Sequence, residues 1–482
     1  MNEMRKSQTR TGAPCFKHCL LLISNLFRAS CFVRRASGFA VLLVVAQASA
    51  GEWKAGAARI NITPEQPMWM SGYADRDHPA EGKLTDLWAK ALVIEDPSGK
   101  RAVMVTLDLI GISREMSAAV CSALSEKHGL ERSRIALCAS HTHTGPVLSG
   151  NLSVMYFLDE TQSRLVDEYS KRLKDNLVTV VDQAIGGLAE CRLAWGQGTA
   201  TFAVNRRNNR EPEVPTLRAA SQLKGPVDHA VPVLRVTDPE GRLKAIVLGY
   251  ACHSTVLAFY QWSGDYPGFA QLHLEQNHPE AIAMFWAGCG ADQNPLPRRT
   301  PELAGEYGRR LADVVETVLA GDMTPISGDL ATSYTEIDLA LDKLPAREQL
   351  ESDQATSNRY LAQLSKMLLA QIDGGTPLAQ TYPYPVQVWR LGPELLWVTL
   401  GGEVVVDYSL RIKSELGPKT WVAGYSNDVM AYIPSRRVLL EGGYEGGGAM
   451  VYYGLPAPWS PEVEESIMRQ VHAGAAAVRT SK

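Results

Sequence analysis

Residues 102–107 read Ala102-Val103-Met104-Val105-Thr106-Leu107, six consecutive residues without a charge. An apolar run of this length is typical of a strand that is covered on both faces. A helix should follow it, because Ser113 can act as an N-cap and apolar residues then recur every four positions from Met116 to Leu124. The next short apolar run, Arg134 to Ala139, predicts a further strand. This order of elements favours an α/β fold.

Strands and helices are predicted to alternate along the rest of the chain. Strands are expected at 59–62, 91–95, 245–248, 281–286, 386–391 and 395–400, and helices at 165–181, after Gly268, and at 303–318. The charged segment 344–372 predicts helices of an outer layer. The polar segment Asn205–Arg210, with the proline-rich sequence up to Pro226, predicts a long loop of the kind that is usually functional or disordered. We therefore expect a mixed β-sheet core flanked by helices, in one large α/β domain over residues 51–482.

The first 50 residues differ in composition from the rest. They carry seven basic residues and one acidic residue, then an apolar run, Phe39 to Ala46, and the small residues Ala48-Ser49-Ala50. This order predicts a signal peptide that is cleaved near Ala50, and hence a secreted or periplasmic protein. A membrane anchor is the alternative, but the apolar run is much shorter than the roughly 20 residues that span a bilayer.

Charge and cysteine content narrow the class of protein. The chain has 48 Lys and Arg and 52 Asp and Glu; without residues 1–50 these become 41 and 51, a formal net charge of −10. Such a balance argues against nucleic-acid binding. The cysteines after residue 50 are widely spaced, odd in number and lack a Cys-x-x-Cys pair: Cys121, Cys138, Cys191, Cys252 and Cys289. They are predicted to be small buried hydrophobic residues and not a disulfide framework.

Three residues with metal-binding side chains follow predicted strands: His141, His253 and Glu403. Ligands in α/β proteins gather at the carboxyl ends of strands, so these residues could converge on one rim. Two imidazoles and a carboxylate form the ligand set of a hydrolytic zinc ion. His143 would share the site if the backbone bends, and Gly145-Pro146 would supply the bend. The alternatives are turn histidines bonded to backbone carbonyls and a solvated Glu403.

No competing catalytic motif is present: the sequence lacks Gly-x-Ser-x-Gly, a P-loop, His-Glu-x-x-His and Gly-x-Gly-x-x-Gly. A series of short motifs instead resembles the neutral ceramidase family, zinc amidases that cleave N-acylsphingosine. The motifs are, in chain order, Ile60-Asn61-Ile62-Thr63-Pro64, Gly72-Tyr73, His141-Thr142-His143-Thr144-Gly145-Pro146, Asn205-Arg206, Ala251-Cys252-His253, Gly402-Glu403, Gly424-Tyr425-Ser426-Asn427-Asp428, Tyr432 and Tyr444-Glu445-Gly446.

The resemblance implies a role for each matching residue. The implied zinc ligands are His141, His253, Glu403 and Tyr432; the implied general base is His143, the active-site arginine is Arg206, and the residue that stabilises the oxyanion is Tyr444. It also implies Zn²⁺ as cofactor and hydrolysis of ceramide, or of a similar lipid, to a fatty acid and a sphingoid base. The expected partner is a lipid or other N-acyl small molecule, with peripheral membrane contact, no nucleic acid and no protein partner.

Two departures from the family concern the substrate more than the chemistry. Val147-Leu148 stands where the family tends to have glycines, and this can reshape the mouth of the pocket. The family's C-terminal immunoglobulin-like domain is expected to be missing. The alternative functions are a zinc hydrolase of the same framework for another N-acyl, ester or cell-wall substrate, and a binding protein without turnover. A full set of ligands, base and oxyanion donors argues against the second.

Overall fold

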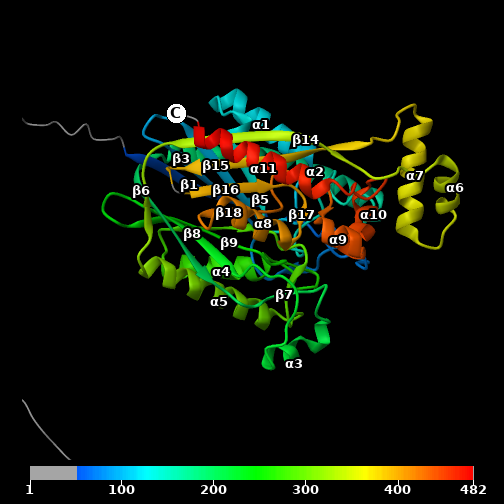
Figure 1. Ribbon diagram of the computed structural model, residues 1–482, viewed down its shortest axis with the longest axis horizontal. Coiled ribbons are helices and arrows are strands. Elements are labelled where there is room, and N and C mark those ends of the chain that lie inside the picture. Colours follow the sequence, from blue (N-terminus) through cyan, green and yellow to red (C-terminus); the bar gives the residue numbers. More distant parts are fainter. Residues whose placement is uncertain (1–51, 394, 481–482) are drawn as a thin grey trace, which may run out of the picture. The chain divides into compact units, whose positions relative to one another are not determined.

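The computed structural model describes residues 52–393 and 395–480 (Figure 1). The predicted signal peptide, residues 1–50, and its cleavage site near Ala50 lie outside the described residues. Helices and strands alternate from β1 (Trp53–Asn61) to α11 (Val463–Thr480). Among the described helices, none has the length and apolar character of a membrane span.

The larger sheet has nine strands. Its order is β11-β9-β8-β6-β1-β3-β4-β5, and β13 pairs with β6. The bounds are β3 (Trp88–Glu95), β4 (Arg101–Leu107), β5 (Ile135–Ala139), β6 (Ala189–Thr199), β8 (Ala230–Thr237), β9 (Leu243–Tyr250), β11 (Ile282–Ala287) and β13 (Thr324–Ile326). Neighbours are antiparallel in the middle of the sheet, whereas β4–β5 and β9–β11 at its two edges are parallel. The predicted mixed sheet is confirmed.

A smaller sheet packs against the larger one. Its order is β14-β15-β16-β18, with bounds β14 (Leu330–Ala340), β15 (Thr381–Leu391), β16 (Leu395–Leu400) and β18 (Thr420–Ala423). The core between the sheets is rich in tryptophan, and the rings of Trp286 and Trp397 lie 6.1 Å apart across it. Side chains of β4 alternate: Val103 and Val105 face a helix-covered core, and Met104 faces the tryptophans. Burial of both faces explains the uncharged run from which β4 was predicted.

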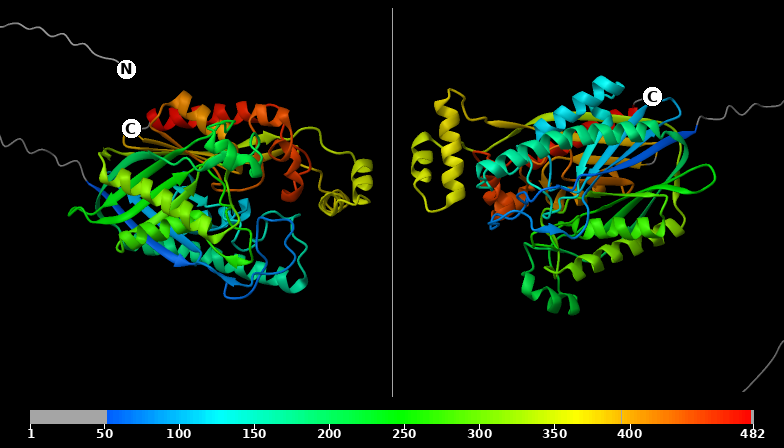
Figure 2. Two further views of the ribbon diagram at one scale, coloured as in Figure 1. Left: turned by 90° about the horizontal axis from the view of Figure 1, so that it is seen from below. Right: turned by 180° about the vertical axis from the view of Figure 1, so that it is seen from behind.

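Helices cover the outer faces of both sheets (Figures 1 and 2). The larger sheet carries α1 (Arg114–His128), α2 (Glu160–Gly186), α4 (Asp265–Asn277) and α5 (Pro301–Ala320), and the smaller carries α8 (Val406–Leu416) and α11. Ser113 caps α1 as predicted, because its side chain accepts the N–H of Met116. All five described cysteines are free and buried, which confirms that prediction.

The remaining elements are short or lie at one end of the sheets. They are β2 (Gly82–Lys83), β7 (Ala203–Asn205), α3 (Val214–Ala219), β10 (Gln261–Trp262), β12 (Gln293–Pro295), α6 (Arg347–Gln354), α7 (Arg359–Asp373), β17 (Glu403–Val404), β19 (Tyr432–Ile433), α9 (Arg436–Glu441), the π-helical turn η3 (Tyr444–Gly448) and α10 (Met450–Tyr453). α6 and α7 form the predicted charged helices (Figure 1). The segment predicted as one long loop contains α3, because Pro215 fits the first turn of a helix and Val214 is fully buried.

A short segment, 424–427, joins the two edges of the larger sheet. On one side, the N–H of Asn427 donates to the carbonyl of Leu137 in β5 at 2.7 Å. On the other, the N–H of Gly424 donates to the carbonyl of Ala287 in β11 at 3.0 Å. The loops that follow β5 and β9 therefore come together although these strands lie far apart in the order of the sheet.

Candidate metal centre

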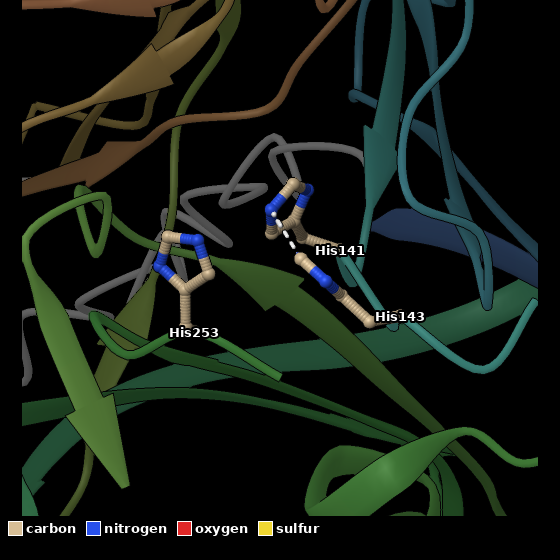
Figure 3. Close-up of side chains that lie close together, drawn as sticks. All are labelled: His141, His143 and His253. Atoms are coloured by element: carbon tan, nitrogen blue, oxygen red, sulfur yellow. Dashed lines mark hydrogen bonds between the residues drawn. The ribbon is translucent and has the colours of Figure 1, made fainter. Parts of the chain in front are cut away.

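His141 and His143 lie in the loop after β5, and the backbone turns at His141. His141 has φ of 60°, a left-handed conformation that is uncommon for a residue other than glycine. A bend was predicted at Gly145-Pro146; the chain turns over residues 143–145 and also at His141. As a result both rings reach one site, with their Nε2 atoms 3.1 Å apart (Figure 3).

His253 joins the pair from the loop after β9. Thr142 and Ser254 form a parallel backbone bridge, which sets the two loops side by side. One ligand atom from each of His141, His143 and His253 lies within 4.8 Å of the others, and the three rings surround a common space (Figure 3). His141 and His253 are each 1% exposed.

Backbone carbonyls fix the orientation of two of the three rings. Nδ1 of His141 lies 2.6 Å from the carbonyl oxygen of Ile110, and Nδ1 of His253 lies 2.8 Å from that of Gly290. A carbonyl can only accept, so each Nδ1 carries a proton and a neutral ring directs the Nε2 lone pair inward. A hydrogen bond of this kind on the outer nitrogen is the usual support of a metal-binding histidine.

Glu403 brings a carboxylate to the same atoms. Its Oε2 lies 3.1 Å from Nε2 of His141 and 3.2 Å from Nε2 of His253, and it accepts no hydrogen bond from the described residues. Its other oxygen accepts the hydroxyl of Tyr453. Burial raises the pKa of Glu403, but the two histidines outweigh burial and hold it well below its usual value. The carboxylate is therefore ionised.

The donor set fits a cation. Burial, with the neighbouring Arg206, lowers the pKa of His253 to about 4, so the ring is neutral. With Nδ1 bonded to Gly290, Nε2 of a neutral His253 is an acceptor 3.2 Å from the carboxylate of Glu403, so a positive charge between the two atoms, a proton or a metal ion, relieves their repulsion. Two imidazoles and one carboxylate suit Zn²⁺ and leave a coordination position open. The residues that would hold zinc are thus His141, His253 and Glu403.

Tyr432 and Arg206 extend the site on one side. The hydroxyl of Tyr432, from β19, lies 3.4 Å from Nε2 of His253, and Nη2 of Arg206 donates to it at 3.2 Å. Nε of Arg206 donates to Glu445 at 2.7 Å, and this ion pair holds the guanidinium in place. Tyr432 lies within reach of a metal held by His253, which agrees with the predicted ligand set without testing it.

Tyr444 lies at the mouth of the site. Its side chain is 44% exposed, and its ring lies 5.2 Å from that of Tyr432. The structure thus gathers His141, His143, His253, Glu403, Tyr432 and Arg206 and places Tyr444 beside them. The roles assigned to these residues from the resemblance stay predictions.

His143 differs from the other two histidines. Its Nδ1 is buried, and nothing in the described part of the chain bonds to it. Burial, with His141 and His253 close by, lowers the pKa of His143 well below its usual value. The ring packs on Gly72, where a Cβ would lie 2.5 Å from it. His143 is held in place by packing with neither nitrogen fixed by a carbonyl, an arrangement that suits proton transfer better than ligation.

Asp292 is a positioning residue that the sequence did not reveal. It is fully buried; its Oδ1 accepts the N–H of Val406, three residues after Glu403, and its Oδ2 accepts the side-chain amide of Asn205, both at 2.9 Å. Its carbonyl accepts the N–H of Arg206 at 2.8 Å. The same segment bonds His253 through Gly290, as described above. In the sequence, residues 288–295 read Gly-Cys-Gly-Ala-Asp-Gln-Asn-Pro, an irregular turn that is no nucleotide-binding fingerprint.

Residues 53–325 match the family described as neutral/alkaline non-lysosomal ceramidase, N-terminal. A neutral ceramidase of Drosophila melanogaster is 24% identical over 304 residues, 61% of this chain and 40% of the relative. Neutral ceramidase 1 of Arabidopsis thaliana is 25% identical over 261 residues, 53% of this chain and 33% of the relative. The matches thus span less than half of these relatives.

A solved structure shares the fold. The crystal structure of neutral ceramidase from Pseudomonas aeruginosa superposes with a TM-score of 0.67 at 22% identity, over 89% of this chain and 74% of that one. A structure titled as a ceramidase complexed with C2 gives 0.68 at 20% identity, over 89% and 75%. These similarities support the arrangement of sheets and helices described above.

Proposed function

This chain belongs to the neutral/alkaline non-lysosomal ceramidase family, and on that premise we propose that it is a zinc-dependent amidase. The proposed reaction is hydrolysis of the N-acyl amide bond of ceramide, or of a ceramide-like lipid, to a fatty acid and a sphingoid base. The observation that carries the proposal is the contact between two acceptors, Nε2 of His253 and Oε2 of Glu403, at 3.2 Å. A zinc ion bound to both atoms would make that contact favourable.

His141, His253 and Glu403, with Tyr432 adjacent, would hold the zinc ion, which would supply a Lewis acid for the amide carbonyl and lower the pKa of water. His143 takes a proton from the attacking water and returns it to the leaving nitrogen. Its pKa, lowered by burial, keeps the ring neutral and ready to accept at neutral pH. Arg206, fixed by Glu445, and Tyr444 stabilise the oxyanion, an effect of about 3 kcal/mol for a well-placed donor.

The substrate and the location of the protein are part of the proposal. Ceramide is proposed because the relatives are ceramidases, and a lipid substrate implies peripheral contact with a membrane. Export after cleavage near Ala50 follows from the composition of residues 1–50. Sequencing the N-terminus of exported protein tests export; an intact Met1 would contradict it.

Metal analysis and a hydrolysis screen on one preparation test the activity. The expected result is one zinc per chain and release of fatty acid from ceramide. Hydrolysis of other N-acyl, ester or cell-wall substrates alone would favour the alternative hydrolase. Zinc binding without turnover of any of them would favour the binding protein.

A further inference from the structure

A cavity of about 510 Å³ adjoins the metal centre on the side of Arg206 and Tyr444. It lies between the loop 206–211, the segment 294–298 and the turn 441–445. Four arginines line it, Arg206, Arg207, Arg210 and Arg298, and three glutamates, Glu211, Glu441 and Glu445. The loop that supplies three of these arginines is the polar, basic segment noted in the sequence.

The lining is polar and has more positive than negative charge. Apart from glycines, its apolar side chains among the described residues are Leu296 and Tyr444. Four arginines against three glutamates leave a formal charge of +1 in a chain whose residues 51–482 sum to −10. A hydrocarbon chain finds little apolar surface here, whereas an acidic group finds an excess of cations.

The arginines keep hydrogen-bonding capacity beyond their ion pairs. Arg207 and Arg298 are 11% and 13% exposed and pair with Glu445 and Glu211 at 2.6 and 2.8 Å. Nε of Arg207 is buried and bonds to nothing in the resolved ranges 52–393 and 395–480. Arg210 is 84% exposed and reaches Glu213 only at 3.4 Å, a surface pair of little strength. A guanidinium has five N–H donors, so further acceptors can be bound.

The cavity begins close to the reacting atoms. Arg206 lines it and also donates to Tyr432 at 3.2 Å, and that hydroxyl lies 3.4 Å from Nε2 of His253. A substrate whose amide reaches the metal centre can therefore extend its polar end into the cavity. A volume of this size is typical of sites for small molecules.

We propose that the cavity binds an acidic group on the amine portion of the substrate. The preferred substrates are then N-acyl amines that carry a carboxylate or a sulfonate near the amide nitrogen. This proposal rests on the proposed amidase function and narrows its substrate class. The reaction is unchanged: water adds OH to the acyl carbon and H to the nitrogen, which gives a fatty acid and an acidic amine.

A matched set of amides tests the preference. N-lauroylglycine and N-lauroyltaurine carry an acidic group, and N-lauroylethanolamine has the same chain with a neutral hydroxyl. We expect the zinc-loaded protein to show kcat/KM about tenfold or more higher for the acidic amides, the size of one charge-assisted hydrogen bond. The preference should shrink at high ionic strength, because salt screens charges beyond about 10 Å at 0.1 M. Equal or faster cleavage of the neutral amide overturns the proposal.

Two variants locate the preference in the cavity. Arg210→Glu, at an exposed position, should lower kcat/KM for the acidic amides about five- to tenfold and that for N-lauroylethanolamine by a smaller factor. Arg298→Gln should act in the same direction. The control is Arg164→Glu on α2, another exposed arginine in a weak pair, 3.9 Å from Glu168, which should change neither. A preference that survives both cavity variants overturns the proposal.

Binding separates this inference from the proposed function. In His143→Ala, calorimetric titration with N-lauroylglycine and N-lauroylethanolamine measures affinity without depending on turnover. Tighter binding of the glycine amide, lost in Arg210→Glu, supports the cavity assignment even if the wild-type protein cleaves no amide. Hydrolysis of ceramide together with equal affinities overturns the inference and leaves the amidase intact.

Discussion

The two sides of the metal centre are built differently. On one side the histidines follow strands of the larger sheet, within the part of the chain that matches the family, 53–325. The outer nitrogens of His141 and His253 are bonded to carbonyls, and both residues are 1% exposed. On the other side Glu403, Tyr432 and Tyr444 come from residues after 400, and exposure rises from 3% at Glu403 to 44% at Tyr444.

This difference predicts separate roles for the two sides: one side binds the metal, and the other side contacts the substrate. The histidine side is rigid and enclosed, so it suits a fixed ion. The other side places one carboxylate at the proposed metal site and then opens through Arg206 and Tyr444 into a polar cavity. Substitutions of His141 or His253 should remove zinc, whereas those at the mouth should keep zinc and change the rate or the choice of substrate.

The largest effect is expected from His253→Ala. It removes one of the predicted zinc ligands beside the carboxylate of Glu403. Zinc and activity should therefore both be lost. Elemental analysis and a hydrolysis assay on the same sample check this. Zinc removal by a chelator should also lower the melting temperature of the wild type, since a ligand at 100 times its Kd stabilises a fold by about 2.7 kcal/mol.

His278→Ala is the matched control for that change. His278 also has its Nε2 near a glutamate, 3.0 Å from Glu316, but the pair is partly exposed and outside the site. It should retain one zinc per chain and wild-type activity. A His253→Ala protein with full zinc occupancy would remove His253 from the ligand set.

The second prediction divides the histidine side itself. His143→Ala should keep zinc and lose about 10²–10⁴ in kcat, the usual contribution of a general base. His141→Ala, two residues away, should lose the zinc, because its outer nitrogen is fixed by Ile110 as a ligand's would be. Zinc content and kcat measured on both variants show which histidine binds zinc and which acts as the general base. A metal-free His143→Ala beside a loaded His141→Ala would reverse the two roles.

Much of this geometry could be predicted from strand ends alone. His141, His253 and Glu403 were each predicted after a strand. In the structure Oε2 of Glu403 lies 3.1 Å from Nε2 of His141 and 3.2 Å from Nε2 of His253. The sequence could not show how β5 and β9 meet, because segment 424–427, nearly 300 residues after β5, bonds to β5 and to β11, the neighbour of β9. Long-range pairing of this kind leaves no local pattern.

Local patterns failed where tertiary contacts override them. Residue type predicted the bend at Gly145, where the chain does bend, but gave no signal for the left-handed conformation of His141, next to the bridge between Thr142 and Ser254. Strands β6, β8 and β14 were not predicted; β6 and β14 carry exposed and half-buried residues that break the apolar run. Asp292 gave no signal, since a buried aspartate in a glycine-containing turn looks like any loop acid.

The third prediction concerns Tyr444, at the mouth of the site. Tyr444→Phe should keep zinc and lose about 10²–10³ in kcat, because it removes a donor that acts on charge formed mainly in the transition state. KM should change little. Tyr452→Phe is the control: its ring lies 6.3 Å from that of Tyr444, farther from Tyr432, and it should leave kcat near the wild-type value. Loss of zinc in Tyr444→Phe would place this residue with the metal ligands.

The smallest effect is expected for Asp292, which lies between the two sides of the metal centre. Asp292 accepts from Val406 and from Asn205, so Asp292→Asn turns one of these contacts into two facing donors and shifts Arg206 or the Glu403 loop. Loss of a hydrogen bond that positions a metal ligand lowers metal affinity or rate about 10- to 100-fold. For Asp292→Asn we expect a loss of about 10-fold.

Two measurements distinguish this positioning role from general damage to the fold. Burial raises the pKa of Asp292 to about 6, so in the wild type protonation below that pH mimics the substitution, and the ratio of wild-type to variant kcat should fall toward one. Asp96→Asn is the control, because Asp96 is as buried and also accepts backbone N–H groups, but in the turn at the opposite end of β3 and β4 from His141. It should lower the melting temperature and leave the kcat ratio independent of pH. If Asp292→Asn also lowers only the melting temperature, the segment 288–295 supports the fold and the two sides of the centre are positioned independently.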